Sequence, residues 1–307
     1  MIDFVGKKRW FFLGSAIVTL VGIVCLSVFG LKPGTDFVGG TAITFHFSES
    51  VEQSILREEM TSLGYGGAVI QNAGEGSFLV HLGEVSSAQA DELAKALGEE
   101  LGCEVTVEDY YLASPTVGMK TARDAGIAVA IAAAAMLVYI AWAFRRMPQP
   151  FRWGTCAVIA LVHDVFIVVA IFSVLGWLAG VEIDAMFITG LLAVVGYSIN
   201  NTVVIFDRIR ENMAKHISPD FAETVNSSIV ETLGRSLNTG LTTLFVLVAL
   251  FLFGGATIHY FVLVLLLGVA IGAYTSVCIS GELLVAWERR EWGRLFSRVP
   301  AARKPAS

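Results

Sequence analysis

A carboxylate within a long apolar stretch is the feature of this sequence that could most readily do chemistry. Asp164 follows His163 inside the mainly apolar stretch Trp153–Leu178. On a helix that starts at Trp153, Asp164 would lie roughly 16 Å along the axis, near the middle of a membrane core about 30 Å thick. An ionisable group at that depth costs about 2.5–3.5 kcal/mol, so the pattern favours a functional role. A carboxyl that merely bonds to a neighbouring helix is the alternative.

Two more polar clusters interrupt apolar stretches. Asn200 and Asn201 are consecutive, about 100° apart on a helix, so both can reach a helix interface. Arg235 and Thr239 have i, i+4 spacing and share one face. Together with Asp164, these clusters predict a hydrophilic path inside a helix bundle, with simple helix–helix hydrogen bonding as the alternative. The remaining polar members are Ser198, Thr202, Asn238, Thr242 and Thr243.

Signatures of enzymes and metal sites are missing from the sequence. The stretch that starts at Gly196 begins like a GxSxG elbow but has Asn200 where the final glycine belongs. No HExxH, Walker A or metal-ligand pattern occurs. The sequence therefore predicts no enzymatic activity, no metal and no cofactor. The cysteines have no metal-ligand spacing and are expected to be small buried residues without disulfides. They are Cys25, Cys103, Cys156 and Cys278.

The elements that must position these groups are membrane-spanning helices. Hydrophobic residues form 55% of the 307-residue chain and charged residues 16%, and the mean hydropathy is +0.69. Soluble domains average about 25% charged residues, so a soluble enzyme, a disordered regulator and a disulfide-stapled secreted module are excluded. Six stretches are long and apolar enough, or nearly so, to span a membrane. They are Trp10–Gly30, Ala125–Phe144, Trp153–Leu178, Ala185–Phe206, Leu237–Phe253 and Tyr260–Trp287.

The Lys and Arg residues predict the orientation. Three precede the first stretch, three lie in 145–152, four in 208–235 and six after Trp287, whereas 179–184 and 254–259 hold none. By the positive-inside rule, both termini are cytoplasmic. The expected parts are a cytoplasmic N-terminus (1–9), a first helix (10–30), an external domain (31–122), helices two to six (123–287, with a cytoplasmic loop at 207–236) and a cytoplasmic tail (288–307).

The external segment is acidic and reads as a small α+β domain. Residues 31–122 hold 14 of the 27 acidic residues and only 4 of the 21 Lys and Arg residues. Hydrophobic periodicity predicts strand–helix–strand–strand–helix–strand, the ferredoxin-like order. Ser87 is a candidate helix cap. His46 and His81 lie on predicted strands, without clustered catalytic residues, so a binding or docking module is expected. The expected elements are Thr41–Phe47, Val51–Leu63, Ala68–Gln71, Phe78–Leu82, Ser86–Leu101 and Cys103–Tyr111.

Four motifs, in order along the chain, resemble those of the SecF family. GTDFVGGT is similar to the family's GxDFxGGT, HDV occurs in the third stretch, and GYSINNTVVIFDRIREN is close to GYSINDTVVxFDRIREN. TLGRSLNTGLTT, residues 232–243, resembles the segment that opens the fifth span. The resemblance covers nearly the whole chain. The matching motif residues include Gly34, Asp36, Phe37, Gly39, Gly40, His163, Gly196, Asp207 and Arg208.

The resemblance implies a function in protein export. SecF proteins pair with SecD, work with the SecYEG translocon and with YajC or YidC, and use the proton motive force to assist late export of an emerging polypeptide. Protons pass a polar cluster between the two bundles. Asp164, Asn200, Asn201 and Arg235 are the corresponding relay residues here. The family's SIND carboxylate is replaced by Asn201, which cannot titrate, so the main coupling carboxylate is expected on the partner.

These patterns predict a polytopic α-helical protein of the bacterial inner membrane, with six helices and one external ferredoxin-like domain. Its expected partners are SecD, the translocon, the exported polypeptide and the lipid bilayer, and no nucleic acid. Half of an RND-type exporter of small molecules or lipids is one alternative. A scaffold that clamps other membrane proteins without transport is another.

Overall fold

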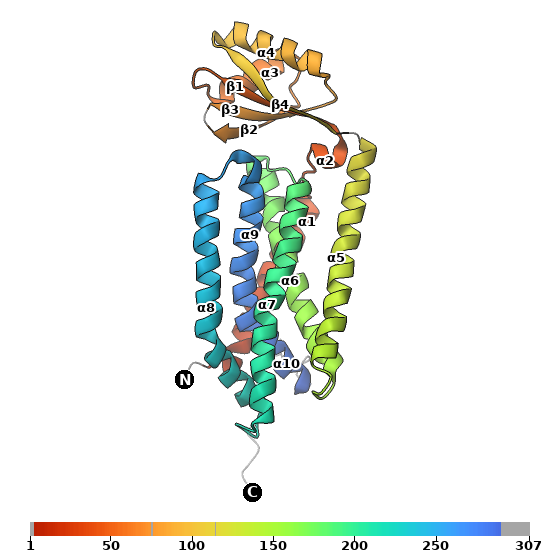
Figure 1. The fold of residues 1–307 in the computed structure, drawn as a ribbon, viewed down its shortest axis with the longest axis vertical. Coiled ribbons are helices and arrows are strands. Elements are labelled where there is room, and N and C mark those ends of the chain that lie inside the picture. Colours follow the sequence, from red (N-terminus) through yellow and green to blue (C-terminus); the bar gives the residue numbers. More distant parts are fainter. Residues whose placement is uncertain (1–2, 75, 114, 290–307) are drawn as a thin grey trace.

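Six long apolar helical segments form the body of the computed structural model, which describes residues 3–74, 76–113 and 115–289. They stand side by side beneath a small α+β domain (Figure 1). The predicted number of spans and the predicted fold class are confirmed. The segments are α1 (Lys8–Phe29, preceded by the 3₁₀ turn η1, Val5–Lys7), α5 (Pro115–Ala143), α6 (Pro150–Ala179), α7 (Ala185–Ala214), α8 (Phe221–Phe253) and a last segment of α9 (Ala256–Thr275), the π-helical turn η2 (Ser276–Ser280) and α10 (Gly281–Glu288).

Helices α7 and α8 extend well beyond their apolar stretches. The segment 207–236, expected as a loop, is helical except for residues 215–220. Arg208 bonds to Glu231 across the two helices, and Asn212 donates to Ser228 Oγ at 3.0 Å. Buried apolar residues such as Val225 and Ile229 also hold the extensions together. Charged residues alternate with them and lower the mean hydropathy, which is why hydropathy alone ended α7 too early and started α8 too late.

The external domain has the predicted ferredoxin-like topology. Its four strands lie in the order β2-β3-β1-β4, with every neighbouring pair antiparallel. Helices α3 and α4 cover the face of the sheet that points away from the bundle (Figure 1). Alternating residues of β1 pack into the core between sheet and helices. The elements are β1 (Gly40–Phe47), α3 (Gln53–Ser62), β2 (Val69–Gly74), β3 (Ser77–Leu82), α4 (Ser87–Leu101) and β4 (Val105–Ala113).

The N-terminus of α4 has a complete capping box. Ser86 Oγ accepts from the Gln89 amide, and the Gln89 side chain accepts from the Ser86 amide at 2.9 Å. The predicted cap, Ser87, is wrong by one residue, because Ser87 is the first helical residue. The reciprocal bonds satisfy two donors that the helix itself leaves free.

Removing this cap should loosen the first turn of α4. We expect Ser86→Ala to cost about 1 kcal/mol, which would speed amide hydrogen exchange in that turn about fivefold. Ser87→Ala is the matched control and should leave exchange unchanged. Equal effects of the two substitutions would contradict the assignment of Ser86 as the cap.

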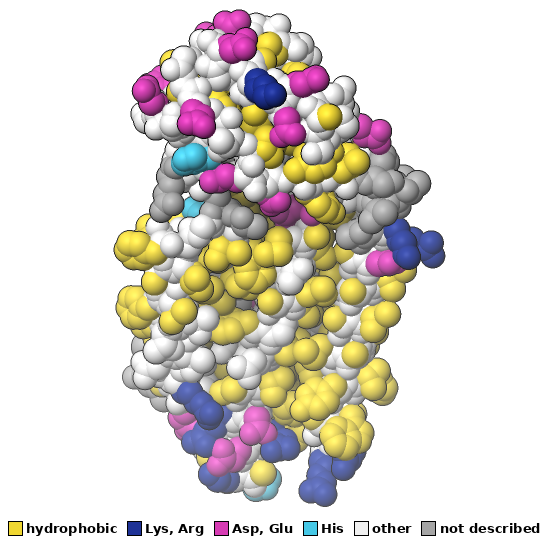
Figure 2. Space-filling model, turned by 45° about the horizontal axis from the view of Figure 1, so that its top comes forward, with side chains coloured by type: hydrophobic (Ala, Val, Ile, Leu, Met, Phe, Trp, Pro, Cys, Tyr) yellow, Lys and Arg dark blue, Asp and Glu magenta, His cyan; other side chains and the backbone are white. Residues whose placement is uncertain are grey.

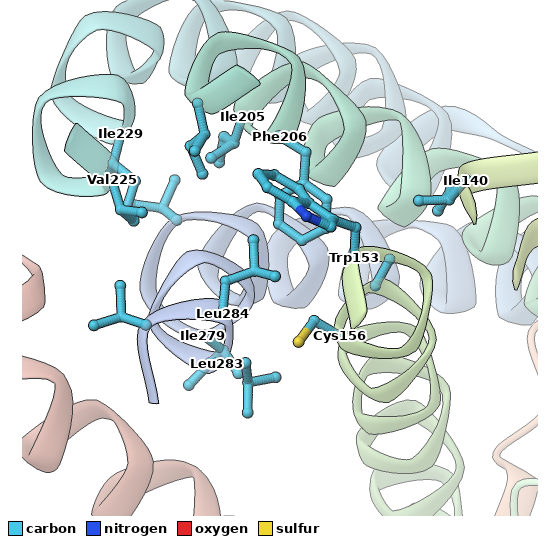
Figure 3. Close-up of a cluster of buried hydrophobic side chains, with 14 of the residues drawn as sticks. Ile140, Trp153, Cys156, Ile205, Phe206, Val225, Ile229, Ile279, Leu283 and Leu284 are labelled. Carbon is cyan, nitrogen blue, oxygen red and sulfur yellow. The ribbon is translucent and has the colours of Figure 1, made fainter. Parts of the chain in front are cut away.

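The largest cluster of buried hydrophobic residues lies in the half of the bundle away from the external domain, and smaller clusters lie in the other half. Trp153 stacks on Phe144 with ring centroids 5.3 Å apart and meets the edge of Phe206. Side chains from α5 to α10 complete this cluster, as Figure 3 shows for ten labelled residues. Cys156 and Cys278 are buried in it, as expected. Cys25 and Cys103 are only half-buried, which differs from the prediction.

Candidate functional site

Asp164 is completely buried in the centre of the bundle. It lies 14 residues from the first residue of α6 and 15 from the last. Its Oδ2 accepts a hydrogen bond from Ser198 Oγ of α7 at 2.5 Å. Gly272 of α9 packs against the same group, since a Cβ placed on Gly272 would lie 3.5 Å from Asp164 Oδ2. Three helices therefore enclose this carboxyl group.

His163 extends the polar contacts toward α1 and α9. Its Nε2 is 2.5 Å from Ser15 Oγ, and its Nδ1 is 3.4 Å from Asp164 Oδ1. Thr275 Oγ1 also lies 3.3 Å from Nδ1. An imidazole beside a carboxyl group can hold a proton on either member. The arrangement can therefore store and pass a proton, and it runs from Ser15 through His163 and Asp164 to Ser198.

More buried polar groups lie on the α7 side of the bundle. Thr202 Oγ1 is 3.1 Å from Ser276 Oγ, and both hydroxyls are buried. Asn201 is also buried, and its Nδ2 has no hydrogen-bond partner within the described residues. Sequence reasoning missed Ser15, Thr275 and Ser276, because a single hydroxyl in an apolar helix does not indicate which face packs inward.

The structure does not bring Asn200 or Arg235 into the interior. Both are exposed, and no hydrogen bond or ion pair joins Arg235 to Asn201 within the described residues. The inward face of α8 carries Thr232, Ser236 and Gly240 instead. The expected pair of facing clusters is therefore wrong for these two residues. Arg235 belongs to an exposed surface that we call the α8 polar stripe. Its members are Arg235, Asn238, Thr239 and Thr242.

The GxDFxGGT motif forms the joint between the external domain and the bundle. Asp36 Oδ2 accepts from the Ala185 amide at 3.0 Å, and Asp184 Oδ1 accepts from the Phe187 amide at 2.7 Å. Both carboxylates thereby cap the N-terminus of α7, where backbone amides favour negative charge. Gly40 has a φ of +124°, and a Cβ there would lie 2.4 Å from the Leu82 carbonyl oxygen. Asp36 and Gly40 of the motif thus have structural roles at this joint, as a helix cap and as a position where only glycine fits. Its other members, Gly34, Phe37 and Gly39, lie in or beside the short helix α2 (Thr35–Val38).

Two titratable side chains from distant segments meet at this joint. His81 Nδ1, at the end of β3, lies 3.7 Å from Glu182 Oε2 in the loop between α6 and α7. Both side chains are largely buried, and Thr35 Oγ1 lies 3.3 Å from the same nitrogen. Burial raises the pKa of Glu182 to about 7, against the opposing effect of Lys32. Burial also lowers the pKa of His81, against the opposing charge of Asp36.

This raised pKa predicts a pH dependence of the joint. Glu182 binds more protons in the folded joint than in the unfolded segment between its ordinary pKa, 4.5, and about 7, so its contribution to stability should fall as pH rises through that window. The lowered pKa of His81 acts in the opposite direction below 6.5, so the fall should be steepest above that pH. Protection of the 181–186 amides from hydrogen exchange, corrected for intrinsic rates, should fall accordingly. Glu182→Gln should remove this dependence, whereas exposed Glu84→Gln should keep it. The same pH profile in the unsubstituted chain and in Glu182→Gln would contradict the prediction.

The remaining motif residues lie at surfaces. Arg208 bonds to Glu231 and Glu211 at 2.5 Å, and Asp207 pairs with Arg210 at 2.6 Å. Gly196 is exposed, with no atom within 4 Å of an added Cβ. The ion pairs of Arg208 and Asp207 stabilise the protruding end of α7.

The described residues include no group of three or more His, Cys, Asp or Glu side chains placed to hold a metal ion.

Comparison with known proteins agrees with this arrangement. The sequence model of the family described as "Protein export membrane protein SecD/SecF, C-terminal" matches residues 93–290. The protein translocase subunit SecF of Thermobaculum terrenum is 40% identical, over 97% of this chain and 98% of its own length. The chain belongs to the SecD/SecF family. The expected resemblance to SecF proteins is confirmed.

Two longer SecD/SecF proteins also match. The translocase subunit SecDF of Bacillus subtilis is 34% identical over 94% of this chain, which covers 38% of that subunit. The crystal structure of SecDF from Thermus thermophilus, described as a translocon-associated membrane protein, aligns with a TM-score of 0.83 at 33% identity. That alignment covers 94% of this chain and 39% of the SecDF chain. This SecD/SecF chain thus spans about two fifths of those two proteins.

Proposed function

We propose that this chain is a SecF-type subunit that assists Sec-dependent protein export and couples late translocation to the proton motive force. The full-length relative of Thermobaculum terrenum is named as a protein translocase subunit, which supports the export role. The proposed coupling to the proton motive force rests on the buried Asp164, which accepts a hydrogen bond from Ser198 and lies beside His163. A membrane-buried carboxyl group with two polar partners is suited to take up and release a proton during a cycle.

SecD is the proposed partner within the membrane, docked against the α8 polar stripe. The match to SecDF proteins supports this pairing. Arg235 lies near the middle of α8, 14 residues from its first residue, and is exposed. It precedes the apolar stretch Leu237–Phe253 by two residues, where a carboxylate of SecD would pair with its planar guanidinium. SecYEG, with YajC or YidC, and the emerging polypeptide are the further proposed partners.

The proton step is divided between the two subunits in this scheme. Asp164 holds a proton in its neutral form, and the Ser198 hydroxyl stabilises the ionised form by donating a hydrogen bond. Asn201 offers hydrogen bonds but no titration. The SecD carboxylate opposite Arg235 is therefore the main coupling group, and Asp164 is the titrating group of this chain near the bundle centre.

The proposed orientation places both termini in the cytoplasm of the bacterial inner membrane and the α+β domain outside. Figure 2 supports it: on the face shown, acidic side chains are scattered over the domain, hydrophobic side chains lie along the bundle, and Lys and Arg gather at the opposite end. The tail from 290 onward, with its basic residues, lies outside the described residues. The apolar band matches a multi-pass position in the bilayer.

A cysteine at Gly67 tests this orientation. Gly67 is exposed in the loop between α3 and β2, and an added Cβ meets nothing within 4 Å. We expect a membrane-impermeant maleimide to label Gly67→Cys in spheroplasts without lysis, with the unsubstituted chain giving the background from its native cysteines. Labelling that requires lysis would place the domain in the cytoplasm and overturn the orientation.

Export itself is measured with inverted inner-membrane vesicles that carry SecYEG, SecA, SecD and this chain. Translocation of a secretory precursor should speed up when a proton gradient is imposed, and this acceleration should disappear in vesicles that lack this chain. Vesicles with the chain but without SecD control for the proposed pairing. Equal acceleration with and without the chain would refute the proposed function and favour the scaffold alternative.

A further inference from the structure

Glu282 is a second completely buried carboxyl group in the bundle. It lies in α10, six residues before the end of the last span, Ile258–Glu288. At 1.5 Å per residue this is about 9 Å from the end of that helix. Neither of its carboxyl oxygens has a hydrogen-bond partner among the described residues. Such a group is costly as an ion and as an unbonded acid, so its presence needs an explanation.

The surroundings of Glu282 are mostly apolar. Its neighbours Leu283 and Leu284 point into the hydrophobic cluster drawn in Figure 3. Three titratable groups interact electrostatically with Glu282. They are Lys8 from the start of α1, and Tyr274 and Cys278 from the preceding turns of the last span.

The charged side chains of the other elements packed on α10 are engaged elsewhere or lie at the surface. Arg152 of α6 pairs with Glu288, and Arg289 pairs with Asp220 before α8. Arg235 of α8 is exposed, as is Lys7 of η1. Lys8 is thus the cation that interacts electrostatically with Glu282, and it is itself largely buried.

A row of buried hydroxyls lies between Glu282 and the Asp164 site. Thr275, Ser276 and Ser280 are each completely buried. Thr275 contacts His163, and Ser280 precedes Glu282 by two residues. The turn Ser276–Ser280 is π-helical, a wider winding that occurs frequently at functional sites. The last span therefore carries polar groups along its buried length from the level of Asp164 toward the cytoplasmic end.

We propose that Glu282 is the proton-carrying group on the cytoplasmic side of Asp164. This inference rests on the proposed function and adds an exit to it. Protonated Asp164 gives its proton, through water and the hydroxyls of the last span, to ionised Glu282, so that Asp164 becomes ionised and Glu282 neutral. Glu282 then releases the proton to the cytoplasm beside Lys8, whose positive charge favours the ionised form.

Glu282→Gln separates this role from a structural one. Gln has nearly the same shape and can accept hydrogen bonds, but it does not titrate. In the vesicle assay with SecD, we expect the acceleration by an imposed proton gradient to fall at least tenfold while gradient-independent export is unchanged. Glu282→Asp keeps the carboxyl group and should retain part of the acceleration. Glu84→Gln, on the exposed surface of the external domain, is the matched control and should behave like the unsubstituted chain.

The outcomes distinguish this inference from the proposed function. If the unsubstituted chain shows no acceleration by the gradient, the proposed function fails. If it does and Glu282→Gln responds equally, only the role of Glu282 fails. Should Glu282→Gln not assemble, infrared difference spectra test the same point on a Glu182→Gln complex with ¹³C-glutamate incorporated into this chain alone, because Glu182 is also buried and burial raises its pKa. A pH step should change a buried glutamic-acid band, and its absence would overturn the inference.

Discussion

An Asp164→Asn chain is expected to assemble normally and to lose the export that an imposed proton gradient adds. Asn has the same shape, and its carbonyl oxygen can still accept the hydrogen bond from Ser198. Only the ability to titrate is removed. Positioned proton-transfer groups contribute roughly 10²–10⁴-fold in rate, so we expect the gradient-dependent part of export to fall at least about tenfold.

Two further variants sharpen this experiment. Ser198→Ala leaves the carboxyl group in place without its hydrogen-bond donor, so gradient-dependent export should be reduced rather than abolished. Asp124→Asn, exposed near the external end of α5, is a matched control and should have no effect. Full gradient-dependent export in Asp164→Asn would leave this carboxyl group with a structural role only.

The second large effect concerns the contact between α7 and α9. Gly268 packs against Val194, and a Cβ on Gly268 would lie 2.1 Å from Val194 Cγ2 and 2.6 Å from Cγ1. Val194 is completely buried, so it has little room to move. Overpacking of this kind costs about 1–3 kcal/mol or more. We expect Gly268→Ala to lower the unfolding temperature of the purified chain in detergent by several degrees.

Gly196 provides the matched comparison for this test. It also lies in a spanning helix, but an added Cβ there meets nothing within 4 Å. Gly196→Ala should therefore be neutral or slightly stabilising, since Ala favours helix by about 1 kcal/mol over Gly. Combining Gly268→Ala with Val194→Ala should recover stability, because the second change removes the clashing methyl groups. A destabilised Gly196→Ala chain, or no recovery in the double variant, would argue against a local clash.

Much of the architecture is readable from composition and periodicity, because burial in lipid and in a sheet core each leaves a simple pattern. The spans follow from long apolar stretches, and the strand order of the external domain follows from the alternation in segments such as 41–47. Asp164 stands out for the same reason, as an ionisable residue in an apolar stretch. Glu182 and His81 do not, since their meeting depends on how two segments about 100 residues apart are brought together.

The orientation of α8 shows where single-helix patterns stop being informative. Arg235 and Thr239 share one face by their spacing, and Thr232, Ser236 and Gly240 share another by the same spacing. Both faces carry polar or small residues, so the sequence does not indicate which one the neighbouring helices cover. Packing against α7 and α9 selects the second face. The extension of α7 beyond Phe206 escaped prediction because its buried apolar residues, such as Ile209, are separated by charged residues that form ion pairs and lower the mean hydropathy.

The two carboxylates at the N-terminus of α7 fix the position of that end of the helix. One of them, Asp36, belongs to the segment that leads into the external domain, and the other, Asp184, belongs to the loop that leads into α7. Ser198 lies 13 residues farther along the same helix than Ala185, about 20 Å at 1.5 Å per residue. One continuous helix thus connects the backbone amide that Asp36 contacts outside the bundle to the hydroxyl group that contacts Asp164 in its centre.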